Sequence, residues 1–144
     1  VAVRFIELMK TTDNDDYFAR HHVKAQGLRD WLERNGWTPA PRAFDAGPAL
    51  EYHHPDHAGA IGLIAPYAPG FCDSCNRLRV TSKGKLRLCL FGDGGVDLRD
   101  LLQDDEDREA LSQRIVSSLG GKTAGHSLAL GRSGDLRNLS QLGG

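Results

Sequence analysis

Three cysteines, Cys72, Cys75 and Cys89, gather in one short stretch of this 144-residue chain, and the other positions hold none. The spacing Cys-x2-Cys-x13-Cys puts two thiolates on one tight turn and brings the third from a later segment. Clustered thiolates suit zinc or an iron–sulfur cluster, and three protein ligands leave one metal position open for a substrate. An odd number of cysteines leaves one thiol unpaired in any disulfide scheme, which favours a metal site in a reducing, cytoplasmic compartment.

Two arginines, Arg77 and Arg79, follow the cysteine pair on the first arm of a predicted β-hairpin. If paired residue numbers sum to 168, Cys89 lies opposite Arg79 and shares a sheet face with Arg77. Guanidinium groups beside the thiolates would capture a phosphate bidentately, whereas the alternative interpretation is a solvated strand face. The hairpin has two arms and a turn in which glycine takes a positive φ: residues 76–81, residues 85–90, and Ser82-Lys83-Gly84 between them.

A structural zinc knuckle is the other interpretation of the cysteine pair, with one of the six histidines or an aspartate completing four ligands. The histidines nearest in sequence are His53, His54 and His57, and none repeats a ligand spacing. A redox dithiol is less favoured, because the pair does not follow a strand and open a helix. From the spacing, a zinc knuckle and an open cluster site remain equal alternatives.

Hydrophobic periodicity predicts the elements that position these residues. Residues 1–9 alternate as a strand does, and their start without a cap or turn suggests a fragment. After a polar loop at 10–16, a helix is predicted from Val23 to Asn35, which Gly36 closes. A second β-hairpin follows, with a turn rich in proline and glycine between two arms, residues 49–53 and 60–65.

The last third of the chain predicts short helices and a tail. Asp97 caps a turn over residues 98–102, and Asp104 or Asp105 opens the next helix. From Lys122 onward the chain is rich in glycine and serine, which predicts an extended tail lying on the rest of the protein. The helix presents one apolar face: Leu111, Ile115, Val116 and Leu119.

The amino-acid composition and the length of the chain limit the classes of protein to which it can belong. With 18 Lys or Arg and 19 Asp or Glu, the formal charge is −1, so no global charge attracts nucleic acid or an anionic membrane. No run of apolar residues reaches the roughly 18 that a membrane span needs. A content of 40% hydrophobic residues permits a real core, and the length suits one domain or a piece of one, below the roughly 250 residues of an eight-fold barrel.

One segment closely resembles the second-cluster segment of the molybdenum cofactor biosynthesis protein A family, the radical S-adenosylmethionine GTP 3',8-cyclases: Gly70-Phe-Cys-Asp-Ser-Cys-Asn-Arg-Leu-Arg-Val-Thr-Ser-Lys-Gly-Lys-Leu-Arg-Leu-Cys-Leu-Phe-Gly92. The C-terminal Arg137-Asn-Leu-Ser-Gln-Leu-Gly-Gly144 is similar to the family's Arg-x-Met-x-x-Ile-Gly-Gly ending, with Leu139 and Leu142 as volume-conserving replacements. Three further stretches look like the last barrel strand, the strand before the cluster and the helix after it: Val3-Arg-Phe-Ile-Glu-Leu-Met9, Ile61-Gly-Leu-Ile-Ala-Pro66 and Val96-Asp-Leu-Arg-Asp-Leu-Leu102.

The resemblance implies an α/β fold that is the C-terminal part of an incomplete (β/α) radical SAM barrel, ending in a hairpin-rich, cluster-binding α+β region. Residues 1–38 would be the last barrel strand and helix, and residues 39–144 the iron–sulfur and GTP-binding region. The implied site residues are Cys72, Cys75 and Cys89 on a [4Fe-4S] cluster whose open iron accepts the purine of GTP, Arg77, Leu78 and Arg79 on GTP, Arg4 on the triphosphate or cofactor, Met9 on S-adenosylmethionine, and Gly143 and Gly144 in a tail associated with active-site access.

The implied activity is conversion of GTP to (8S)-3',8-cyclo-7,8-dihydroguanosine 5'-triphosphate in molybdenum cofactor (molybdopterin) biosynthesis. The family's radical-generating Cys-x3-Cys-x2-Cys loop has no counterpart before Cys72, so the chain by itself is expected to be inactive. The implied partners are GTP, a second copy in a homodimer and a separate N-terminal half, with no membrane and no nucleic acid. The alternative is a stand-alone zinc-binding module that binds phosphate or nucleic acid through five basic residues: Arg77, Arg79, Lys83, Lys85 and Arg87.

Overall fold

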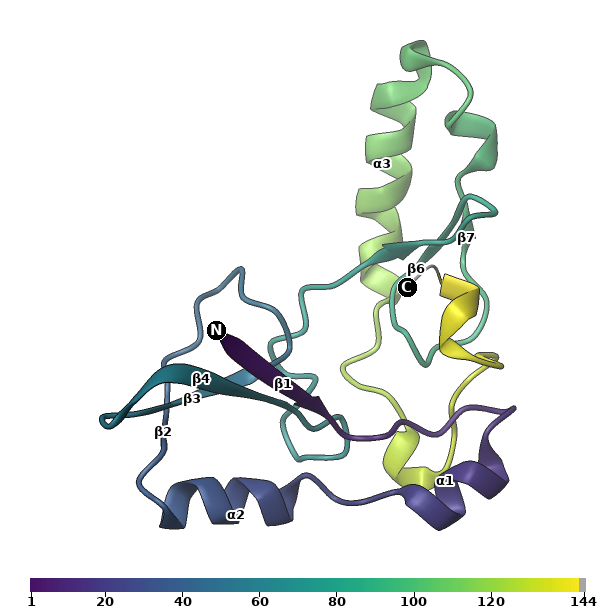
Figure 1. Ribbon diagram of the computed structural model, residues 1–144. Helices are drawn as coiled ribbons and strands as arrows, with labels where there is room; N and C mark the ends of the chain where they lie inside the picture. The colour runs from purple at the N-terminus through teal and green to yellow at the C-terminus, as the bar shows by residue number, and fades with distance from the viewer. Residues whose placement is uncertain (143–144) are drawn as a thin grey trace. The chain divides into compact units, whose positions relative to one another are not determined.

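The computed structural model describes residues 1–142 and divides the chain into two compact units (Figure 1). Unit 1 contains Val1–Met9 and Asp16–Cys75, and unit 2 contains Lys10–Asp15 and the chain from Asn76 onward. The first strand is hydrogen-bonded to a strand that lies beyond residue 38, and the predicted boundary at residue 38 stays a prediction. Within the described residues, no helix is long and apolar enough to cross a membrane.

Unit 1 is built on a four-stranded mixed sheet with the order β1-β4-β3-β2. β1 runs parallel to β4, and β4 runs antiparallel to β3, as the predicted hairpin requires. The predicted N-terminal strand and second hairpin are therefore confirmed, with the turn shortened to Pro55 and Asp56. The strand bounds are β1 Ala2–Ile6, β2 Thr38–Pro39, β3 Leu50–His54 and β4 His57–Ile64.

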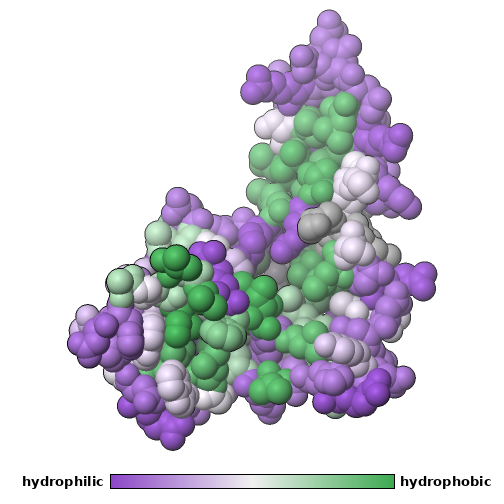
Figure 2. Space-filling view, viewed as in Figure 1, coloured by the Kyte–Doolittle hydropathy of each residue, from purple (hydrophilic) through white to green (hydrophobic). Residues whose placement is uncertain are grey.

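The core of unit 1 forms where α2 (Gln26–Arg34) packs on this sheet. Leu32 and Tyr52 are completely buried, and the Tyr52 hydroxyl accepts a hydrogen bond from Arg29 Nε at 3.2 Å. The helix predicted over 23–35 is confirmed with shorter bounds, and Gly36 closes it at φ +82°. Figure 2 shows an apolar patch over β1, and three apolar residues of this strand are exposed: Val3, Phe5 and Ile6.

One helix was not predicted, α1 (Asp15–His21). It has seven residues, none of them buried, so it carries little periodic signal. Its Phe18 stacks on His22 with ring centroids 4.4 Å apart, and Tyr67 meets the His22 ring edge-on. A helix this short is marginal by local propensity, and here it makes contacts with a residue distant in sequence, Tyr67.

Unit 2 contains a three-stranded antiparallel sheet in the order β5-β6-β7. Gly84 has φ +73° and donates its N–H to the Thr81 carbonyl, which confirms the predicted glycine turn. The predicted register is wrong: Arg79 pairs with Arg87, not with Cys89. Gly84, with its positive φ, is the last residue of the three-residue loop, so the loop is centred on residue 83. The predicted register had placed its centre at residue 84. The strands are β5 Arg79–Val80, β6 Lys85–Arg87 and β7 Val96–Asp97.

The helical part of unit 2 follows the predicted caps. Asp97 accepts a hydrogen bond from Arg99 N at 2.9 Å, and Asp104 accepts one from Glu106 N at 3.2 Å. The second cap opens a 3₁₀ turn that continues into α3 (Arg108–Ser118). No residue of α3 is buried, and Figure 2 shows an apolar stretch along it. Within the described residues, the predicted apolar face is only partly covered, because Leu111 and Ile115 are half-buried whereas Val116 and Leu119 are exposed.

The tail from Lys122 packs against the rest of unit 2, as predicted. Leu128 and Leu136 are buried, and residues 128–130 and 139–142 form 3₁₀ turns instead of extended chain. Thr12 N donates to the Leu136 carbonyl at 3.2 Å, and Asp13 N donates to the Arg137 carbonyl at 3.0 Å. Gly143 and Gly144 lie outside the described residues.

Candidate functional site

The first two cysteines lie on a tight turn of unit 1, as their spacing predicts. Cys75 N donates to the Cys72 carbonyl at 3.0 Å, and Asp73 N donates to the Gly70 carbonyl at 3.1 Å. Gly70 has φ +75°, a conformation that favours glycine and lets the chain enter the turn. Ser74 on this turn accepts a hydrogen bond of 2.6 Å from Arg42 Nη1, so the turn is tied to the loop before β3.

Cys89 belongs to unit 2, where it lies in a bend just after β6. All three cysteines are half-buried and free of disulfide bonds, so the donor set has the soft thiol chemistry that an iron–sulfur cluster takes. Within residues 1–142, no three Cys, His, Asp or Glu side chains form a metal-binding group. Because the three cysteines are divided between the two units, the tri-cysteine site stays a prediction.

Arg77 has a buried guanidinium nitrogen, Nη1, that finds no hydrogen-bond partner within the described part of the chain. A buried cationic donor without a partner is costly, and a bound anion would satisfy it. The Arg77 carbonyl accepts a hydrogen bond of 3.1 Å from Lys122 Nζ, which fixes the backbone from which the side chain extends. Leu78 is partly exposed, and Arg79 is half-buried in β5.

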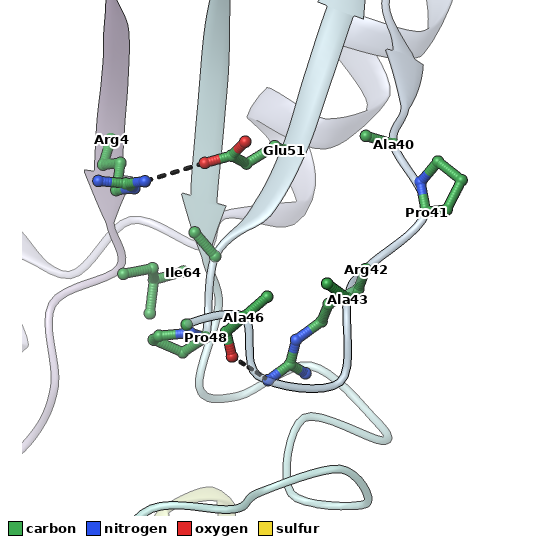
Figure 3. A pocket seen from close by; sticks show the side chains of 11 residues that line it. Arg4, Ala40, Pro41, Arg42, Ala43, Ala46, Pro48, Glu51 and Ile64 are labelled. Carbon is green, nitrogen blue, oxygen red and sulfur yellow. Dashed lines mark hydrogen bonds and ion pairs between the residues drawn. The ribbon is translucent and has the colours of Figure 1, made fainter.

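Arg4 lines an open cavity of about 560 Å³ in unit 1 (Figure 3). Arg4 Nη2 and Glu51 Oε1 form an ion pair of 2.9 Å, and Gly62 of β4 is the strand neighbour of both residues. A Cβ on Gly62 would lie 2.9 Å from Arg4 Cγ, so glycine makes the space in which Arg4 crosses β4.

A second arginine, Arg42, lines the same cavity from the loop that precedes β3. Its Nη2 donates to the Ala46 carbonyl at 3.3 Å (Figure 3), and its Nη1 holds Ser74 of the cysteine turn. Two guanidinium groups and one carboxylate, Glu51, give the cavity an excess of positive charge. Sequence reasoning missed Arg42 and Glu51, because neither stands in a recognisable spacing with Arg4.

Met9 follows β1 in unit 1 and is half-buried. The segment that leads to it is anchored by Glu7, which is buried, bonds to His22 Nε2 at 2.8 Å and donates its N–H to the Ile64 carbonyl. A buried carboxylate needs such a partner. The signal for this pair, an acidic residue inside an apolar strand, was present in the sequence but was not used.

An ion pair on the Cys89 side of unit 2 joins β6 to the tail. Arg87 Nη2 bonds to Asp135 Oδ1 at 2.5 Å, and Gly94 N donates to Asp135 Oδ2 at 2.9 Å. The hydrogen bond from Arg87 lowers the pKa of Asp135 below its ordinary value, and the bond from Gly94 acts in the same direction against some desolvation. This carboxylate is therefore held in its charged form.

Comparison with known proteins decides the family. Residues 1–128 match the family described as Molybdenum Cofactor Synthesis C. The chain belongs to this family. That membership confirms the resemblance read from the cysteine segment, and it does not favour a stand-alone zinc module.

Curated relatives of the chain carry the name GTP 3',8-cyclase. One from Stenotrophomonas maltophilia (strain K279a) is 58% identical over 143 residues, which are 99% of this chain and 44% of the relative. One from Synechococcus elongatus is 51% identical over 144 residues, which are 100% of this chain and 44% of the relative. The chain thus spans less than half the length of these relatives and is similar to their C-terminal portion.

Proposed function

We propose that this chain is the C-terminal, GTP-binding and cluster-binding portion of a GTP 3',8-cyclase. The cyclase names of relatives that match 99–100% of the chain support the activity. The structural observation that carries the proposal is the buried Nη1 of Arg77, because a cationic nitrogen kept from water without a partner is suited to an anionic ligand. GTP brings that anion as its triphosphate.

Within unit 2, Arg77 and Arg79 bind GTP, and Leu78 between them contributes apolar contact. Arg77 supplies charge-assisted hydrogen bonds, which are about twice as strong as neutral ones. The planar guanidinium presents two donors to one phosphate or carbonyl group, a geometry that lysine cannot reproduce. These residues therefore orient the nucleotide without taking part in bond breaking.

Within unit 1, Arg4 and Arg42 provide further anion contacts for the triphosphate or the cofactor. They line one cavity, and the Arg4–Glu51 pair keeps the Arg4 side chain over β4. Met9 contacts S-adenosylmethionine in the complete enzyme, and β1 is the last strand of its (β/α) barrel. The parallel pairing of β1 with β4 supports that role, since barrel strands are parallel.

Cys72, Cys75 and Cys89 are the proposed ligands of a [4Fe-4S] cluster. When bound, this cluster supplies an open iron position for the guanine of GTP. Three clustered cysteines that form no disulfide bond support the assignment, and they agree with the proposed reducing, cytoplasmic location. The donor set has no fourth cysteine, which is why a ligand position stays open.

The complete reaction would convert GTP to (8S)-3',8-cyclo-7,8-dihydroguanosine 5'-triphosphate with a radical derived from S-adenosylmethionine. The chain holds no further cysteines for the cluster that starts such chemistry, so by itself it binds substrate but does not generate the radical. We also propose that the complete enzyme is a homodimer.

Anaerobic reconstitution with iron and sulfide tests the cluster assignment. We expect about four iron atoms per chain and a brown absorption spectrum, and we expect Cys75→Ala and Cys89→Ala to lose both. Asp73→Ala, at an exposed position on the same turn, is the matched control and should keep the iron. Stoichiometric zinc after anaerobic reconstitution, or full iron content in both cysteine variants, would contradict the proposal.

A further inference from the structure

The β5–β6 ladder ends at the pair Arg79 and Arg87, before it reaches Cys89. Beyond that pair, the two chain segments no longer form ladder hydrogen bonds with each other, and their carbonyl groups need other donors. Lys122 from the tail fills this position, because its Nζ donates to the Arg77 carbonyl at 3.1 Å and also to the Leu88 carbonyl. One ammonium group therefore joins the backbone of both arms where the ladder stops.

The two carbonyls belong to residues at or next to the candidate site, Arg77 and Leu88. Arg77 has a buried guanidinium nitrogen without a partner among the described residues, as Arg87 does at Nε, and Leu88 directly precedes Cys89. A lysine carries three donors and no acceptor, so it can hold two carbonyls at once. Hydrogen bonds from a charged donor contribute more than neutral ones.

The tail makes a second contact with the loop that follows Cys89. Asp135 accepts hydrogen bonds from Arg87 and from Gly94 N, on either side of that loop. At Gly134, with φ +63°, a Cβ would lie 2.6 Å from the carbonyl oxygens of Phe91 and Gly92. The tail backbone therefore touches the loop so closely that only glycine fits.

We propose that Lys122, Gly134 and Asp135 form a clamp that positions Cys89 and Arg77, and that Lys122 is a positioning residue for cluster retention and GTP binding. The inference rests on the proposed function for what Cys89 and Arg77 bind. The clamp itself consists of contacts within unit 2. Groups that orient metal ligands from outside the ligand set change metal affinity or activity roughly 10- to 100-fold when they are removed.

The test uses a complete cyclase that carries this segment, reconstituted anaerobically. Lys122→Met removes the ammonium and keeps the length of the side chain. We expect iron loss to a chelator to accelerate roughly tenfold or more, and GTP affinity measured by calorimetry to fall. Lys122→Arg should restore much of both, because a guanidinium can also donate to two carbonyls. Arg132→Met, which removes one positive charge from an exposed tail position, should match the wild type.

A second measurement does not depend on the cluster. In the iron-free protein, hydrogen exchange of residues 87–94 should be faster in Lys122→Met and in Asp135→Ala than in the wild type. Wild-type exchange in both variants, together with unchanged chelator kinetics and GTP affinity, would overturn the clamp. If Lys122→Met does not fold, wild-type exchange and chelator kinetics in Asp135→Ala would overturn it.

The proposed function fails separately from the clamp. If Cys89→Ala keeps its full iron content, Cys89 is not a ligand, and the functional part of the inference falls with the proposed site. If Cys89→Ala loses iron while Lys122→Met keeps wild-type kinetics, the cluster stands and the clamp is wrong.

Discussion

Arg77→Met removes a guanidinium group and keeps the aliphatic stem of the side chain. The Arg77 Nη1 atom is buried without a hydrogen-bond partner among the described residues. The backbone contact to Lys122 uses the Arg77 carbonyl, so the substitution leaves it in place. The variant therefore isolates the side-chain nitrogen from the backbone contact.

The substitution should act in opposite directions on the stability of the fold and on GTP affinity. A buried donor without a partner costs about 1–3 kcal/mol, so its removal should keep or raise the free energy of unfolding of the ligand-free protein by about 1 kcal/mol. A charge-assisted hydrogen bond to the ligand contributes about 1.5–3 kcal/mol, so the Kd for GTP should rise roughly 10- to 100-fold. Arg77→Lys should also lose affinity, because an ammonium lacks the two-donor fork.

Urea unfolding of the ligand-free protein and calorimetry with GTP measure the two effects in a complete cyclase that carries this segment. Arg132→Met is the control for loss of one positive charge, and its GTP affinity should equal that of the wild type. Arg79→Ala should weaken GTP binding by about 1.5–3 kcal/mol as well. The reasoning is refuted if Arg77→Met lowers the free energy of unfolding by more than about 1 kcal/mol and leaves GTP affinity unchanged.

Three further outcomes test other parts of the structure. Because the hydrogen bond from Arg87 lowers the pKa of Asp135, this carboxylate stabilises the fold above its ordinary pKa, and the contribution is lost as the pH falls through the lower folded pKa. Asp135→Asn should therefore lose less stability than the wild type over that range in acid unfolding, and a profile equal to the wild type would contradict this. Leu32→Ala empties a completely buried position and should lower the free energy of unfolding by about 2–5 kcal/mol in urea titrations, whereas a loss below about 1 kcal/mol would show that the core repacks. Deletion of Gly143 and Gly144 from a complete cyclase should sharply reduce turnover and leave iron content and thermal stability unchanged, and full turnover after the deletion would remove the tail from catalysis.

Local chemistry was sufficient for several elements. Gly84 predicted its turn because a positive φ favours glycine, and Asp97 and Asp104 predicted helix starts because a short acceptor satisfies free N–H groups. The register of the hairpin was not predictable in the same way. It depended on whether Gly84 is the pivot or the last residue of the loop, and the backbone places it last.

Much of the candidate site depends on contacts that span the sequence. Arg4 and Glu51 are 47 residues apart and meet because β1, β4 and β3 are neighbours and Gly62 leaves room between them. Arg42 reaches Ser74 across 32 residues. Such contacts cannot be predicted from spacing along the chain, because they depend on the order of the strands and on the reach of the side chains.

The sequence by itself determined the cysteine set, the neighbouring arginines, the turn glycines and the family, since each depends on residue type and spacing. Only the tertiary structure decided that Lys122 joins the Arg77 and Leu88 carbonyls, which are 45 and 34 residues away from it, and that Asp135 holds Arg87. A flexible lysine or an aspartate in a glycine-rich tail has no preferred partner until the chain has folded. Its partners are then the carbonyls and the guanidinium that the end of a short β-ladder leaves within reach.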